Sequence, residues 1–164
     1  MSQADGTLLD KLFERRNRER SSQEKKKIVI REEDATLERN RQGTMRWYLH
    51  PENDDACIKS LVVYRYEMPP GSHTGKQRVQ GNLAAYCISG YGHVTVDGVA
   101  HEWEAGDVIG LPPMREGHEL QLFNDSQGEA RVIFAQPNFM AIYGIDFGCG
   151  FEQLEDASSA SATS

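Results

Sequence analysis

Short segments with strand-forming sequences recur every 8–12 residues between positions 45 and 137, and this spacing is the strongest constraint on the fold. The segments MRWYLH at 45–50 and CIKSLVVYRYEM at 57–68, for example, are rich in β-branched and aromatic residues. Turn signals separate such segments, including PPG at 69–71 and the hairpin dipeptide DG at 97–98. Regular short strands of this kind predict an all-β chain that folds as an antiparallel sandwich or barrel.

The predicted barrel covers residues 28–150, between two terminal segments of different composition. Residues 1–27 contain eight Lys and Arg against five Asp and Glu, and we expect them to form a charged helical extension. Residues 151–164 end in DASSASATS, which has no apolar anchor. We therefore predict a C-terminal tail that is largely disordered.

A narrow apolar stripe marks the predicted N-terminal helix, and it consists of Leu8, Leu9, Leu12 and Phe13. Thr7 is placed to cap this helix, with Asp10 three residues later in a variant of the capping box. Such a small stripe needs to be buried against something. These four residues are therefore candidate contacts with the chain's own barrel or with another chain.

Composition and charge exclude several classes of protein. The net charge of -7 argues against nucleic-acid binding, which requires clustered Lys and Arg. No signal peptide is visible, and no segment approaches the roughly 18 apolar residues of a membrane span, so we expect a cytoplasmic protein without a membrane partner. Cys57, Cys87 and Cys149 show no CxxC spacing, which makes a disulfide framework or a thiolate metal site improbable.

Two spaced motifs give a more specific indication of the fold. Gly71 and Gly90 enclose GSHTGKQRVQGNLAAYCISG, and the second motif follows with Gly106, Pro112, Gly117 and Asn124. Their spacing resembles the two conserved motifs of the cupin superfamily, and WEAGDVIGLP adds to the likeness. The resemblance covers about residues 60–137 and implies a single cupin barrel, a double-stranded β-helix or jelly roll.

The same spacing locates the four positions where cupins typically hold a divalent metal ion with three His and one Glu. Here those positions are Gln77, Val79, Leu83 and Leu120. Three of these side chains are aliphatic and have no lone pair, and a neutral amide is a poor ligand for a transition metal. We therefore predict no metal and no catalytic residue in this chain, and we read the motif as a barrel scaffold.

Two alternatives to a packed, metal-free interior remain at this stage. One is a shifted metal site built from His73, Gln77 and His118, because His118 lies on the same strand face as Leu120. The other is an open pocket for a small aromatic or apolar ligand. The candidate lining residues are His73, Gln77, Val79, Leu83, His118, Leu120 and Leu122.

A closer resemblance concerns function. It rests on four segments: RNRQGTMRWYLHP, MPPGSHTGKQRVQG, WEAGDVIGLPP and the final QPN…GFEQLE. Together they are similar to the small (alpha) subunit of two-component hydroquinone 1,2-dioxygenases, which act in nitrophenol and hydroquinone degradation. The resemblance implies a non-catalytic, metal-free cupin subunit. It also implies a larger cupin partner that carries the ring-cleaving Fe(II) site, in a hetero-oligomer of two plus two subunits. Other aromatic-pathway cupins often carry histidines where Gln77 and Val79 stand, and this departure fits an inactive subunit better than a lone enzyme. The enzymatic alternative is a stand-alone dioxygenase with a rearranged metal site.

Overall fold

A computed structural model describes residues 7–23, 26–53, 56–138 and 152–158. The predicted barrel residues 139–150, Cys149 and the end of the predicted tail at 159–164 lie outside these described residues. No helix among the described residues is long and apolar enough to cross a membrane.

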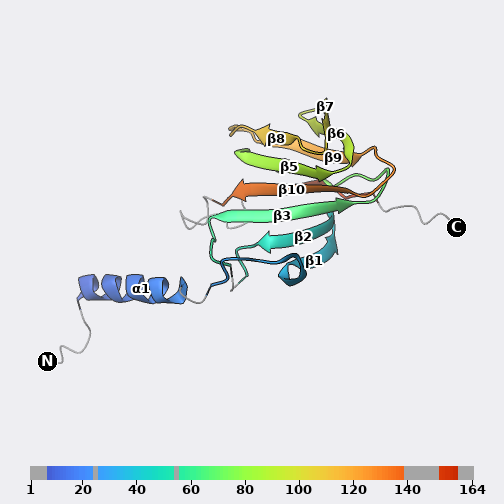
Figure 1. Cartoon of the computed structure of the whole chain (residues 1–164). Helices are drawn as coiled ribbons and strands as arrows, with labels where there is room; N and C mark the ends of the chain where they lie inside the picture. Colours follow the sequence, from blue (N-terminus) through green and yellow to red (C-terminus); the bar gives the residue numbers. More distant parts are fainter. Residues whose placement is uncertain (1–6, 24–25, 54–55, 139–151, 159–164) are drawn as a thin grey trace.

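Two antiparallel sheets form the body of the molecule (Figure 1). The larger sheet contains, in spatial order, β1 (Thr36–Asn40), β2 (Gly43–Leu49), β3 (Leu61–Met68), β10 (Ala130–Pro137), β5 (Leu83–Ser89) and β8 (Val108–Leu111). The smaller sheet contains β11 (Glu152–Glu155), β4 (Lys76–Val79), β9 (His118–Asn124), β6 (Tyr91–Val96) and β7 (Val99–Glu104). A helix, α1 (Leu8–Gln23), and a short 3-10 helix, η1 (Glu32–Asp34), precede the sheets. The prediction of an all-β jelly roll with an N-terminal helix is confirmed.

Alternating side chains place the core between the two sheets. In β5, Leu83, Ala85 and Cys87 are buried while the residues between them are exposed, as expected for a strand with one face toward solvent. Burial also raises the pKa of the Cys87 thiol to about 11, which keeps this thiol protonated and unreactive at neutral pH.

The glycines of the two motifs serve the backbone. Gly71, Gly90, Gly106 and Gly117 all have positive φ, which non-glycine residues rarely adopt. At Gly90 the constraint is double, because a Cβ atom there would lie only 2.6 Å from the Cβ of Ala130 at the start of β10. The motif therefore specifies turns and close strand packing, whether or not a metal is bound.

Asn124, the last motif residue, ties the smaller sheet to the larger one. Its side-chain nitrogen lies 2.9 Å from each of three backbone carbonyl oxygens, those of Met68, Pro69 and Gly128. Its side-chain oxygen accepts hydrogen bonds from the backbone N–H and the hydroxyl of Ser126, at 3.0 and 2.6 Å. One fully buried amide thus holds the end of β9, the end of β3 and the loop before β10.

The termini show one expected and one unexpected feature. As predicted, Thr7 and Asp10 form a capping box: the Asp10 N–H donates to the Thr7 hydroxyl at 3.2 Å, and the Thr7 N–H donates to the Asp10 carboxylate at 2.9 Å.

The prediction of a largely disordered C-terminal tail is wrong for residues 152–158, which the structure describes and which include strand β11. Strand β11 pairs with β4, and ion pairs from Lys76 and Arg78 to acidic residues of β11 hold it there without apolar anchors.

We expect Asn124→Ala to lower the free energy of unfolding by about 1–3 kcal/mol, because it leaves buried backbone groups without partners. Urea denaturation followed by circular dichroism measures the change. Asn17→Ala on the exposed surface of α1 is the matched control and is expected to change stability little. Equal stabilities for the Asn124 and Asn17 variants would contradict the role assigned to Asn124.

Candidate functional site

The four positions equivalent to cupin metal ligands lie together inside the barrel. Gln77 and Val79 are on β4, Leu83 begins β5, and Leu120 is in the middle of β9, directly opposite Gln77 in the strand pairing. All four side chains are buried. Leu122, two residues further along β9, is buried beside them in the same core cluster.

These residues do not fit a metal ion. Val79, Leu83 and Leu120 offer no donor atom, which leaves one amide where four ligands would be needed. Within the described part of the chain, no group of three His, Cys, Asp or Glu side chains is arranged to hold a metal. Burial of the aliphatic side chains instead contributes about 1.5–3 kcal/mol for each large one, relative to exposure.

His73 and Gln77 lie in different environments. The His73 ring contacts the outer side of the smaller sheet, where its Nδ1 atom lies 3.0 Å from the amide nitrogen of Gln121 and its ring packs on Phe123. Gln121 alternates with the buried, inward-facing Leu120 and Leu122 along β9. His73 is therefore not brought to the interior position of Gln77.

His118 is held at the end of β9 by two acceptors. Its Nδ1 atom lies 2.7 Å from a carboxylate oxygen of Asp97, and its Nε2 atom lies 3.0 Å from the carbonyl oxygen of Pro112. Asp97 occupies the β6–β7 turn with φ of 51°, and the hydrogen bond from His118 helps to lower the pKa of its carboxyl. With both nitrogens engaged, His118 joins the start of β9 to the β6–β7 turn and to the segment after β8, and no ring nitrogen is left for a metal.

The amide of Gln77 is the unusual polar group of the interior. Gln77 is fully buried, and among the described residues neither its oxygen nor its nitrogen has a hydrogen-bond partner. Burial, together with Tyr64, raises the pKa of Tyr66 well above its ordinary range, whereas Gln77 acts to lower it. The Gln77 amide therefore lies near the Tyr66 hydroxyl without meeting hydrogen-bond geometry.

Aromatic rings fill the interior beside this amide. The ring of Phe134 stacks on Tyr64 with centroids 5.4 Å apart, and it meets Tyr66 edge to face at 5.3 Å. The Tyr66 hydroxyl donates to the side-chain oxygen of Gln42 at 3.1 Å, and the Gln42 nitrogen donates to Gln153 on β11 at 2.6 Å. Sequence reasoning did not find this cluster, although alternation along β3 could have placed Tyr64 and Tyr66 on one face.

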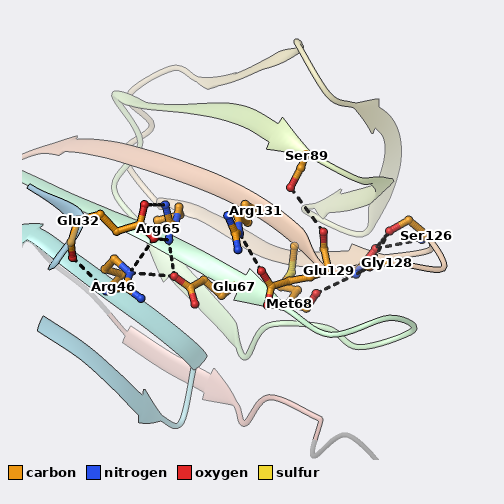
Figure 2. A network of polar contacts seen from close by, with 11 residues as sticks. Glu32, Arg46, Arg65, Glu67, Met68, Ser89, Ser126, Gly128, Glu129 and Arg131 are labelled. Atoms are coloured by element: carbon orange, nitrogen blue, oxygen red, sulfur yellow. Dashed lines mark hydrogen bonds and ion pairs between the residues drawn. The ribbon is translucent and has the colours of Figure 1, made fainter. Parts of the chain in front are cut away.

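A second unpredicted feature is a cluster of charged groups on the larger sheet (Figure 2). The guanidinium group of Arg65 lies 2.8 Å from Glu32 of η1 and also contacts Glu67, which lies 2.9 Å from Arg46. The Arg65 side chain is nearly fully buried, so its two carboxylate partners compensate a charge that would be costly alone. The cluster fixes η1 on the sheet.

The candidate partner contacts Leu8, Leu9, Leu12 and Phe13 are all exposed, from 86% for Leu8 to 42% for Phe13. Figure 1 shows α1 lying apart from the sheets, so the stripe is not covered by the chain's own barrel.

Comparison with known proteins agrees with this architecture. Residues 64–135 match the family model described as a cupin domain. No curated protein matches the sequence.

Solved cupin-like structures share the fold at low sequence identity. The polyketide cyclase RemF from Streptomyces resistomycificus superposes with a TM-score of 0.58 and 15% identity, over 82% of this chain and 88% of the other. A predicted oxalate decarboxylase from Thermotoga maritima gives 0.52 and 19%, over 77% and 100%. An RmlC-like cupin from Shewanella frigidimarina gives 0.51 and 15%, over 66% and 88%. At these identities the likeness concerns the fold alone.

The charge cluster predicts a pH dependence of stability. Burial acts to raise the pKa of Glu67, but hydrogen bonds and charges from Arg65 and Arg46 outweigh it, so the pKa lies below its ordinary 4.5. The stabilisation by ionised Glu67 is therefore fully present above pH 4.5 and is lost as the pH falls through the lowered pKa. Glu67→Gln is expected to cost about 1–3 kcal/mol at pH 7 and progressively less below pH 4.5.

Urea unfolding of the Glu67 variant at pH 7 and pH 3 measures this difference. Glu116→Gln removes an exposed carboxylate paired with Arg115 at 3.6 Å and serves as the control, with little effect at either pH. A deficit of Glu67→Gln that stayed the same in acid would indicate a packing defect and not a lost charge.

Replacement of Gln77 is predicted to affect stability in the opposite direction to replacement of Glu67. Gln77→Met keeps the side-chain length and removes an amide without protein partners, so we expect stability to be unchanged or to rise by up to about 1–3 kcal/mol. Thermal unfolding, with Gln42→Met as the matched control, measures this. Gln42 accepts and donates hydrogen bonds, and its replacement should destabilise. Destabilisation by Gln77→Met would indicate that water or a ligand satisfies the amide.

Proposed function

We propose that the chain is a non-catalytic, metal-free cupin subunit of a heteromeric Fe(II)-dependent hydroquinone 1,2-dioxygenase, in which it supports a larger catalytic cupin subunit. The observation that carries the proposal is the replacement of metal ligands by buried aliphatic side chains at Val79, Leu83 and Leu120. The described part of this interior offers no donor set for iron, which supports assigning the ring-cleaving chemistry to another chain.

The resemblance of the motifs to the small subunits of such enzymes supports the assignment. In this scheme the larger subunit binds Fe(II) and O2 and opens the ring of a 1,4-diol next to a hydroxylated carbon. The present chain supplies no group to that reaction, and the complex is a cytoplasmic heterotetramer of two plus two subunits. Its contribution is to stabilise the fold of the partner.

The Gln77 amide, which has no hydrogen-bond partner among the described residues, favours a second candidate function, binding of a small aromatic ligand inside the barrel. A fully buried amide beside Tyr66, Tyr64 and Phe134 could hold a phenolic hydroxyl while the rings pack on the ligand. Isothermal titration of the isolated chain with hydroquinone separates this candidate from the first. Saturable binding that Gln77→Met abolishes would favour it.

The main proposal is tested by purifying the chain alone and after co-expression with the chain encoded beside it. We expect less than about one-tenth of an iron per chain and no hydroquinone cleavage for the isolated chain, because its ligand positions lack donors. The co-purified complex should contain iron, cleave hydroquinone and have the mass of a heterotetramer by light scattering.

The matched control for a shifted metal site is His73→Ala. This change should leave the iron content and activity of the complex unaltered, because the residue lies on the outside of the smaller sheet. Stoichiometric iron and ring cleavage in the isolated chain, lost in His73→Ala, would overturn the proposal and favour a stand-alone enzyme.

A further inference from the structure

A groove opens where the two sheets end. Strand β8 is the last strand of the larger sheet and β7 the last strand of the smaller one. Between them lies a groove of about 320 Å³, whose apolar lining includes Val94, Val96, Trp103, Val108, Ile109 and Leu111. Val108 is 68% exposed, so apolar surface continues from the groove onto the edge of β8.

Acidic side chains surround this groove. Glu102 and Asp107 line it directly beside His101, and Glu104 lies in the adjoining depression with the two acids. All three are exposed. An apolar groove with an acidic rim is complementary to an apolar surface flanked by basic groups.

Helix α1 has this complementary surface. Leu9, Leu12, Phe13, Arg16 and Arg20 recur at three- and four-residue spacing, so one face of the helix is apolar in its first half and basic in its second. The Arg16 guanidinium lies over the Phe13 ring at 4.9 Å, which places a positive charge directly beside the apolar stripe. The helix contains five Lys and Arg against three Asp and Glu, whereas the protein as a whole has a net charge of -7.

The helix and the groove of one copy are held on different sides of the molecule. Lys27 is paired with Ala56, and Glu32 is held by Arg65, so the chain that follows α1 is fixed near β2 and β3. Three residues separate the end of α1 at Gln23 from Lys27, and the exposure of Leu9, Leu12 and Phe13 shows that α1 does not lie in its own groove. The groove lies at the opposite edge of the larger sheet, five strand spacings or about 24 Å from β1.

We infer that the groove between β7 and β8 binds helix α1 of a second copy of this chain. Two copies exchange helices reciprocally, so that each groove is filled once and the assembly closes as a symmetric dimer. Leu9, Leu12 and Phe13 enter the apolar groove, and Arg16 and Arg20 meet Glu102 and Glu104 at its rim. This contact is separate from the proposed dioxygenase role and does not depend on it.

Sedimentation equilibrium of the full chain tests the apolar part of the contact. The wild type is expected to be a dimer at micromolar concentration. Leu12→Ser with Phe13→Ser, and separately Val108→Asp, should raise the dimer dissociation constant at least about a hundredfold. Glu14→Ser with Arg18→Ser changes the opposite helix face at similar cost in helix propensity and without a change in net charge, and this control should leave the dimer intact.

Charge reversal identifies the occupant. Two double variants are made. The helix variant carries Arg16→Glu and Arg20→Glu, and the groove variant carries Glu102→Lys and Glu104→Lys. Each variant should be monomeric when alone. An equimolar mixture of the two chains should recover the dimer, because each exchanged helix then meets a groove of opposite charge. Circular dichroism confirms that both variants are folded.

Three results would overturn the inference. The first is a wild type that stays monomeric up to about 100 micromolar, well above typical dissociation constants of specific dimers. The second is a dimer that is insensitive to both the helix and the groove substitutions. The third is a mixture of the two charge-reversed variants that stays monomeric. A monomeric chain whose α1 becomes protected only when the larger subunit is added would instead assign the helix to that partner.

Discussion

The hydrogen bonds of Asn124 are the interaction on which the rest of the fold depends. Two separate sheets need a fixed connection before their inner faces can pack, and Asn124 provides it by joining β9 to the end of β3 and to the loop before β10. Because the amide is fully buried, each of these bonds is made away from competing water. Because β4 pairs with β9 and β5 pairs with β10, the same connection also relates the strands that carry Gln77 and Leu83.

In metal-binding cupins the ion joins strands inside the barrel, whereas aliphatic side chains at three of the equivalent positions here join the strands by packing. Val79, Leu83 and Leu120 come from β4, β5 and β9, and they now meet through close packing inside a single core cluster. Packing of this kind is undirected, so it needs the turns to fix strand register. This need explains why Gly71, Gly90, Gly106 and Gly117 keep their positive φ although the ligands are absent.

Features encoded by local sequence could be predicted, and features that depend on distant partners could not. The Thr7–Asp10 cap and the turns at the motif glycines each rest on a few neighbouring residues. Strands β1 and β11 gave no signal because their side chains are largely exposed and show no apolar alternation. Likewise, the burial of Arg65 depends on Glu32, 33 residues earlier, whose position only the folded chain defines.

Because side chains fill the interior, the edges of the two sheets are the places where this molecule can bind a partner. Strands β7 and β8 end their sheets with unpaired backbone groups on their outer sides, and such edges are prone to association unless they are covered. The exposed acids at 102, 104 and 107 keep these edges soluble but leave the apolar groove between them open. Such a surface combines charge, which selects between partners, with apolar burial, which provides most of the affinity of a contact.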